Sequence, residues 1–120
     1  MSFENLEVWK KSSRLSAELY RELKELKDYG FRDQITRAGL SIPSNIAEGS
    51  GRATVKDCSN FLSYAKGSCG ELKTQIHIGI EAGYINRVLG ERWLSEADAI
   101  NSMLAGLIRA KRSKIKAVNR

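Results

Sequence analysis

The stretch VKDCSNFLSYAKGSCGELKTQIHIGIEA, residues 55–82, decides the fold. Its small and apolar residues recur at alternating steps of four and three, which places them on one face of an α-helix. The apolar–polar alternation of a half-buried strand does not occur in it. The stretch therefore predicts a helix with a continuous packing seam, formed by Cys58, Leu62, Ala65, Cys69, Leu72, Ile76, Gly79 and Gly83.

Three glycines, Gly67, Gly70 and Gly79, lie inside this predicted helix. Each of them costs about 1 kcal/mol of helix stability relative to alanine. We expect a helix that keeps three such residues to have another backbone packed closely against it. Local flexibility of the helix is the alternative interpretation.

Similar periodicity on both sides of this stretch predicts three further helices. They span residues 4–27, 32–48 and 87–111, and Asp28-Tyr29-Gly30 is the expected stop signal of the first. Short breaks between helices of similar length are typical of a bundle. The predicted fold is all-α: an antiparallel, up-down-up-down four-helix bundle.

Each flanking helix has its own apolar face. The predicted faces are Leu6, Trp9, Ser13, Ser16, Tyr20 and Leu23, widened by Leu15, Leu19 and Leu26, in the first; Phe31, Ile35, Ala38, Ile42 and Ile46 in the second; and Trp93, Ala97, Ile100, Leu104 and Leu107, with Met103 and Ile108 beside them, in the last.

Pro43 lies inside the second predicted helix. We expect it to kink that helix, because proline has no N–H to donate and its ring presses on the carbonyl four residues back. That carbonyl belongs to Gly39, whose small size eases the crowding. The alternative is two shorter helices that meet at Ser41-Ile42.

The bulk composition fits one domain. The chain has 120 residues, of which 42% are hydrophobic and one is proline, enough for a single core. No apolar run reaches the length of a membrane span, and the first residues lack the apolar segment of a signal peptide. We therefore expect a cytoplasmic protein. Cys58 and Cys69 would lie about 16 Å apart on one helix, too far for a disulfide, so reduced thiols are expected.

The positive charge is concentrated at one end of the sequence. The formal net charge is +6, and all 14 acidic residues and 14 of the 20 basic ones lie in residues 1–108. The predicted division is therefore a bundle domain, residues 1–111, followed by a basic tail, residues 112–120. Such cations can bind a phosphate backbone through counterion release, although they also suit the negative pole of a helix end. The candidate nucleic-acid-binding residues are Arg109, Lys111, Arg112, Lys114, Lys116 and Arg120.

Residues with recognisable catalytic or metal-binding spacing are missing from the sequence. The only histidine, His77, lies between two isoleucines without a nearby nucleophile in a reactive motif. Gly49-Ser50-Gly51-Arg52 is rich in glycine but lacks the lysine of a phosphate-binding loop. We expect no catalytic residue, no metal site and no cofactor.

Two polar clusters remain near the predicted apolar faces. They comprise Arg37, Ser41, Ser44, Asn45 and Glu48 on the second helix, and Lys66, Ser68 and Glu71 on the third. Buried polar groups without hydrogen bonds cost about 1–3 kcal/mol each. We expect these residues to form a mutual network that fixes helix register and satisfies the carbonyl freed by Pro43. A contact with another subunit or a ligand is the alternative.

The segment QITRAGLSIPSNIAEGSGR, residues 34–52, resembles the signature of the bacterial four-helix bundle proteins of the S23, or 23S rRNA intervening-sequence, family. The pieces FENLEVWKKS, FLSYAKGSCGEL, GYI and MLAGLI agree with it, so the resemblance covers nearly the whole chain. Family members commonly carry alanine where Gly39 stands.

The resemblance implies antiparallel bundles that assemble into homopentamers and have no assigned enzymatic activity. It extends to the accessory variability proteins of diversity-generating retroelements, which are basic pentamers that bind nucleic acid and a reverse transcriptase. The signature positions it implies, for folding, assembly or a ligand, are Arg37, Ser41, Pro43, Asn45, Glu48, Gly49, Gly67, Ser68 and Glu71.

Together, the residues and the resemblance predict a non-enzymatic, homo-oligomeric scaffold that binds nucleic acid, RNA more than DNA, through its basic end. The alternative is a protein–protein interaction module without a direct role on nucleic acid.

Overall fold

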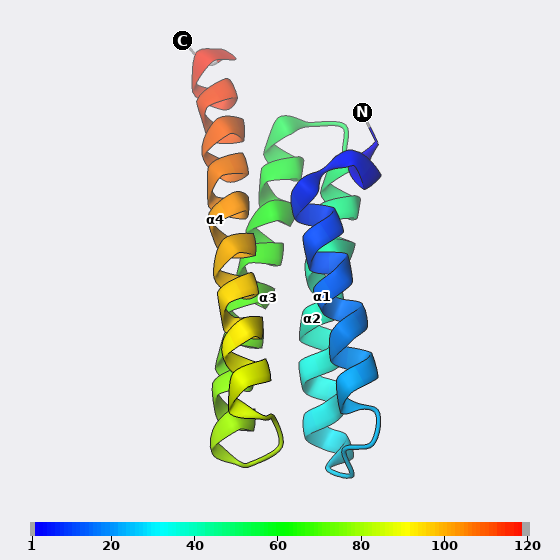
Figure 1. Ribbon diagram of the computed structural model, residues 1–120. Coiled ribbons are helices and arrows are strands. Elements are labelled where there is room, and N and C mark those ends of the chain that lie inside the picture. Colours follow the sequence, from blue (N-terminus) through cyan, green and yellow to red (C-terminus); the bar gives the residue numbers. More distant parts are fainter. Residues whose placement is uncertain (1, 119–120) are drawn as a thin grey trace.

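The computed structural model describes residues 2–118 and contains no strand in that range. A short 3-10 helix, η1 (Phe3–Asn5), precedes four α-helices. Figure 1 shows successive helices running in opposite directions along one long axis. The all-α, four-helix class predicted from the sequence is confirmed. The α-helices are α1 (Glu7–Leu23), α2 (Tyr29–Ser50), α3 (Val55–Glu81) and α4 (Arg87–Val118).

The helices bury one core, to which α3 contributes as predicted. Its seam is buried from Leu62 to Gly79, Cys58 is half-buried, and Gly83 lies in the following loop. The predicted apolar faces of α2 and α4 also point inward. The fully or almost fully buried members of those two faces are Ile35, Ala38, Ile42, Ile46, Trp93, Ala97, Ile100 and Leu104.

The predicted inward face of α1 is partly wrong. Tyr20, which was expected to face the core, is 46% exposed. Val8 and Ser12, which were not in the predicted face, are buried. The Ser12 hydroxyl can be buried because its Oγ donates to the Trp9 carbonyl of the same helix at 3.2 Å. The buried residues of α1 are Val8, Ser12, Leu15, Ser16, Leu19 and Leu23.

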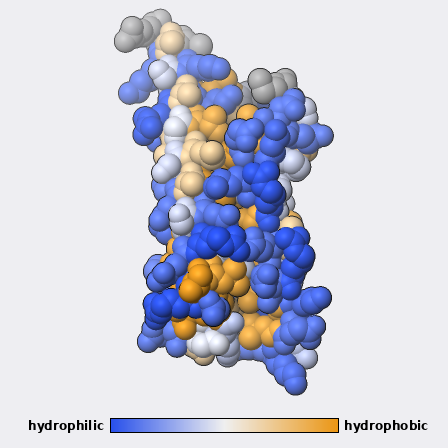
Figure 2. All heavy atoms as spheres, in the orientation of Figure 1, coloured by the Kyte–Doolittle hydropathy of each residue, from blue (hydrophilic) through white to orange (hydrophobic). Residues whose placement is uncertain are grey.

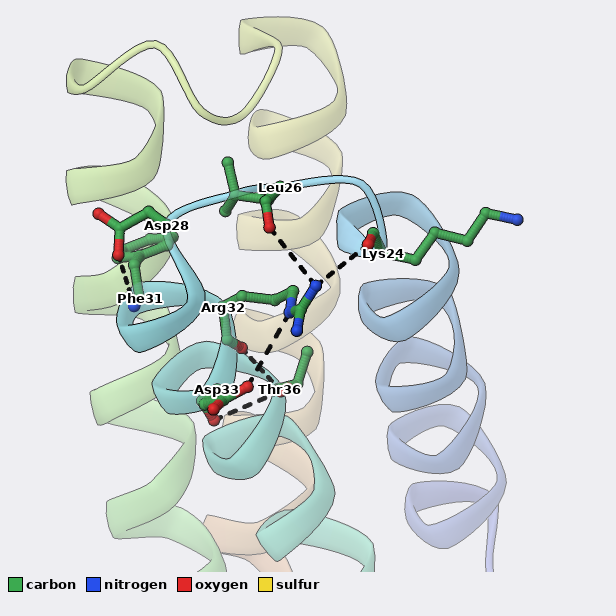
Figure 3. Close-up of polar contacts among 7 residues, drawn as sticks. All are labelled: Lys24, Leu26, Asp28, Phe31, Arg32, Asp33 and Thr36. Atoms are coloured by element: carbon green, nitrogen blue, oxygen red, sulfur yellow. Dashed lines mark hydrogen bonds and ion pairs between the residues drawn. The ribbon is translucent and has the colours of Figure 1, made fainter.

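Asp28 begins a helix rather than ending one. Its carboxylate accepts a hydrogen bond from the Phe31 N–H at 3.1 Å, which caps α2. Arg32 then donates to the carbonyls of Lys24 at 3.2 Å and Leu26 at 3.5 Å, and so closes the loop between α1 and α2 (Figure 3). As a result α1 ends earlier, and α2 begins earlier, than the sequence predicted.

The second helix is continuous through Pro43, which is buried. The alternative of two shorter helices that meet at Ser41-Ile42 is therefore wrong. The kink at Pro43 stays a prediction.

A single positive φ angle marks the turn into the last helix. Gly83 has φ of +79°, a conformation that glycine adopts without the steric cost of a Cβ atom. Asn86 then caps α4, because its Oδ1 accepts from the Val88 N–H at 2.9 Å. The fourth helix continues to Val118 rather than ending near Lys111, so the described part of the predicted tail is helical.

A hydrogen bond ties together the two loops at the end of the bundle opposite the end of α4. The Tyr84 hydroxyl, after α3, donates to Asp28 Oδ2, before α2, at 2.7 Å. The Phe31 ring also packs edge-on against the Tyr84 ring, with centroids 5.3 Å apart. The bond to Tyr84 lowers the pKa of the Asp28 carboxyl and raises the pKa of the Tyr84 hydroxyl.

We expect Tyr84→Phe to lower the melting temperature at pH 7. A carboxyl whose folded-state pKa is lowered stabilises the fold above its ordinary value of 3.8 and loses that contribution as the pH falls through its folded pKa. The difference from wild type should therefore shrink below that value, as measured by circular-dichroism melting. Tyr20→Phe removes an exposed hydroxyl without this bond and is the control. A deficit for Tyr84→Phe that is unchanged in acid would contradict the assignment.

Candidate functional site

The described candidate nucleic-acid-binding residues all lie on the last turns of α4. We call Arg109, Lys111, Arg112, Lys114 and Lys116 the basic end. Figure 1 shows the last turns of α4 projecting beyond the loop between α2 and α3. The sixth candidate, Arg120, lies outside the described residues.

The basic end is open to solvent and forms no ion pair among the described residues. Arg109, Arg112, Lys114 and Lys116 are exposed, and Lys111 is half-buried. No ion pair joins any of the five to another residue in the range 2–118. Because these cations do not have to break an ion pair with a carboxylate first, they are available to bind an external anion.

Ion pairs elsewhere neutralise the body of the bundle. Lys73 and Asp98 join α3 to α4 at 2.5 Å. Arg92 of α4 donates to the Glu18 carboxylate of α1, and this bond is the main reason why the pKa of Glu18 is lowered. These pairs connect positions far apart in the sequence, so no spacing along the chain could have predicted them.

The signature positions divide by burial rather than forming one cluster. Pro43 and Gly49 are buried, whereas Ser41, Asn45 and Ser68 are half-buried. The other four, which are Arg37, Glu48, Gly67 and Glu71, are exposed.

The predicted network between the two polar clusters is wrong. Ser41 Oγ donates to the Ala38 carbonyl and Asn45 Nδ2 to the Ser41 carbonyl, each at 2.8 Å. Both side chains therefore bond to their own helix. No hydrogen bond between described residues joins them to Ser68 or Glu71, nor does any side chain bond to the carbonyl of Gly39. The exposed members face solvent instead.

Arg52 contributes a contact that the sequence did not indicate. Its guanidinium pairs with Glu48 at 2.5 Å and lies over the Phe61 ring, 4.5 Å from the centroid. It therefore joins the end of α2 to the first turns of α3. This gives the signature residue Glu48 a local role in closing the turn.

Gly49 lies where α2 packs closely against α3. A Cβ atom at this position would lie 3.1 Å from Phe61 Cβ and 3.2 Å from the Cys58 carbonyl oxygen, closer than ordinary contacts. Gly67 and Gly70 differ, because nothing lies within 4 Å of a Cβ atom built there. The expected close neighbour of the α3 glycines is thus not present at Gly67 or Gly70 within one protomer.

Gly67 belongs to an exposed face of α3. We call Tyr64, Gly67, Glu71, Thr74 and Ile78, which follow a three-and-four spacing, the outer α3 face. Tyr64 is 57% exposed and Ile78 is 52% exposed. This face is opposite to the buried seam and combines a glycine, two large apolar side chains and a carboxylate.

The nucleophilic and metal-ligating residues do not assemble into a reactive group. Cys69 is fully buried, its Sγ donates to the Ala97 carbonyl at 3.1 Å, and burial raises the pKa of its thiol. Cys58 is half-buried and His77 is exposed. Across residues 2–118, no three His, Cys, Asp or Glu side chains are placed to hold a metal ion. None of the described helices is long and apolar enough to cross a membrane.

The chain is similar to proteins of one known family. Residues 4–106 match the family model of the 23S rRNA-intervening sequence protein. The chain is also similar to the crystal structure of a protein of unknown function from the S23 ribosomal protein family of Bacteroides thetaiotaomicron. The two share 28% identity with a TM-score of 0.79, over 84% of this chain and 97% of that one. No curated protein matches the chain.

The family match covers α1, α2, α3 and the first part of α4. It ends before Arg109, so the basic end follows the matched residues. Both matches agree with the resemblance seen in residues 34–52, and neither assigns a molecular activity. The chain belongs to the 23S rRNA-intervening sequence protein family.

Proposed function

We propose that this protein is a non-enzymatic, cytoplasmic scaffold that assembles into a homo-oligomer, a pentamer, and binds nucleic acid through its basic end. The observation that carries the proposal is the group of five cations on the last turns of α4, with no acidic residue among them. The remainder of the chain is nearly balanced in charge, so the positive potential is local.

The chemistry of phosphate binding suits this arrangement. Lysine and arginine release condensed counterions when they neutralise phosphates, which gives affinity without reading sequence. Assembly would place several basic ends on one particle and raise their effective concentration. The family description refers to an intervening sequence of 23S rRNA, which favours RNA over DNA.

The outer α3 face supports self-association. Each helix-interior glycine lowers helix stability by about 1 kcal/mol relative to alanine, and Gly67 has no neighbour in the protomer that requires its small size. A second copy packed against this face would require it. The exposed side chains of Tyr64 and Ile78 supply apolar area for such a contact. The number of five subunits comes from the family resemblance.

The alternative function is a protein–protein interaction module without a role on nucleic acid. Exposed apolar side chains favour this alternative, among them Leu40 on α2 and Tyr64 on α3. A module of this kind would show no salt-dependent affinity for RNA or DNA, which separates the two proposals.

Neutralising the basic end should abolish nucleic-acid binding while leaving the helices intact. Glutamine keeps helix propensity close to that of lysine and arginine. We expect the affinity for a generic single-stranded RNA to fall at least about 100-fold, with a salt slope lower by about 0.7 per phosphate contact removed. Fluorescence anisotropy at several salt concentrations measures both. The variant carries R109Q, K111Q, R112Q, K114Q and K116Q.

A matched control removes the same number of charges from the body of the bundle. Equal losses in the two variants would show that net charge, rather than the basic end, sets the affinity, and would contradict the proposal. Duplex DNA of the same length tests the preference for RNA. The control carries R14Q, R21Q, K24Q, K27Q and K56Q, all at exposed positions.

The assembly is tested by Gly67→Arg. Space around Gly67 is open in the protomer, so the fold should persist, but the long side chain would block close approach of a second copy. Light scattering should give a wild-type mass near five times 13.4 kDa and a lower mass for the variant. Val88→Arg, at a position 79% exposed on α4, should keep the wild-type mass. An unchanged mass in Gly67→Arg would exclude this face as the interface.

A further inference from the structure

A cavity of about 500 Å³ lies beside the basic end. It is bounded by α4, by the stretch from the end of α2 to the first turns of α3, and by the segment before α1. Leu6, Leu62 and Leu107 line it with apolar surface, and Lys111 and Lys114 line it with positive charge. Arg52 also lines it, but its charge is paired with Glu48. Three segments that are distant in the sequence therefore build one concave site.

The register of α4 aims two of the five cations at this cavity. Lys111 and Lys114 follow Leu107 by four and seven residues, which keeps them on the same side of the helix. That side packs into the bundle through Leu104, which is fully buried. The inward face of α4 thus changes from apolar to cationic where it passes the cavity.

The cavity has the charge of an anion site. Its lining contains no acidic residue. A second cavity, of about 290 Å³ on the side of α1, is also lined by basic residues but includes the carboxylates of Glu18 and Glu96. Carboxylates in the lining repel a phosphate, so the two cavities differ in the ligand that they can accept.

The apolar part of the lining narrows the class of ligand further. Phosphate alone gains nothing from leucine side chains, whereas a nucleobase can remove its flat apolar face from water by lying against them. No aromatic side chain of the described residues lines the cavity, so the base is held by burial rather than by stacking on a ring. A volume of this size lies within the range of about 300–1,000 Å³ of small-ligand pockets. A base paired in a duplex is stacked between its neighbours and cannot enter. Figure 2 shows apolar residues between α1 and α4, with hydrophilic side chains around them.

We infer that this cavity holds one unpaired nucleotide of a bound single strand. Its phosphate lies between Lys111 and Lys114, and its base lies against Leu6, Leu62 and Leu107. This inference rests on the proposed function and adds to it that the protein prefers single-stranded segments over duplex.

The first test compares two pairs of cations on the same turns of α4. K111Q/K114Q removes two charges that line the cavity, and R109Q/R112Q removes two that do not. For a 12-nucleotide poly-uridine RNA, we expect the first pair to lower affinity about tenfold more than the second. For an RNA duplex of equal length, the two pairs should lower affinity equally. Anisotropy titrations at one fixed salt concentration measure both, and circular dichroism checks that helicity is retained.

The second test uses Cys58 as a reporter inside the cavity. Cys58 lines the cavity and is half-buried, whereas Cys69 is fully buried, so a maleimide reports on Cys58. We expect the poly-uridine RNA to slow labelling several-fold in wild type, but not in K111Q/K114Q. The duplex should not slow it, and Cys58→Ser should remove the labelling.

The outcomes separate this inference from the proposed function. Equal affinity losses in the two pairs, with labelling of Cys58 unaffected by bound RNA, would overturn the nucleotide site and leave binding by the basic end in place. If the wild-type protein binds neither RNA, the proposed function fails, and the nucleotide site fails with it.

Discussion

The three-and-four spacing of small and apolar residues on α3 is the constraint on which the structure depends. Because this seam is buried against both α2 and α4, it fixes which side of α3 faces inward. The opposite side is then fixed as well, and it carries Tyr64, Gly67 and Ile78. Small residues such as Ala65 and Gly79 let the neighbouring elements approach α3. One periodic pattern therefore sets both the core and the surface proposed for assembly.

The sequence predicted the fold class and the inward residues of α2, α3 and α4, because long apolar periodicity is a strong signal. The sequence-based prediction was wrong at positions where a single local contact determines which helix a residue caps or which side of a helix is buried. Asp28 reads as part of a stop signal, but its carboxylate caps the next helix. Tyr20 fits the apolar spacing of α1 but is exposed, whereas Ser12 is buried because its hydroxyl bonds to the helix itself. Such choices depend on side-chain geometry that spacing does not record.

The candidate site was predictable only in part. The charge of the basic end follows from counting residues, and Glu48 and Gly49 were found through the family signature. Their roles were not, since the ion pair to Arg52 and the approach of α2 to α3 arise only after folding. The cavity could not have been predicted, because Leu6, Arg52 and Lys114 meet through topology alone. Lys111 and Lys114 are indistinguishable from Arg109 and Arg112 until the register of α4 is known.

The helical continuation of α4 to Val118 also has an entropic consequence. A disordered basic segment must give up its conformational freedom when it settles on a polyanion, and that loss weakens the association. A helical segment has already lost that conformational freedom when the protein folds. Its charges are held at a fixed rise of about 1.5 Å per residue. Less of the electrostatic attraction to a polyanion is therefore offset by the entropy lost when the segment binds.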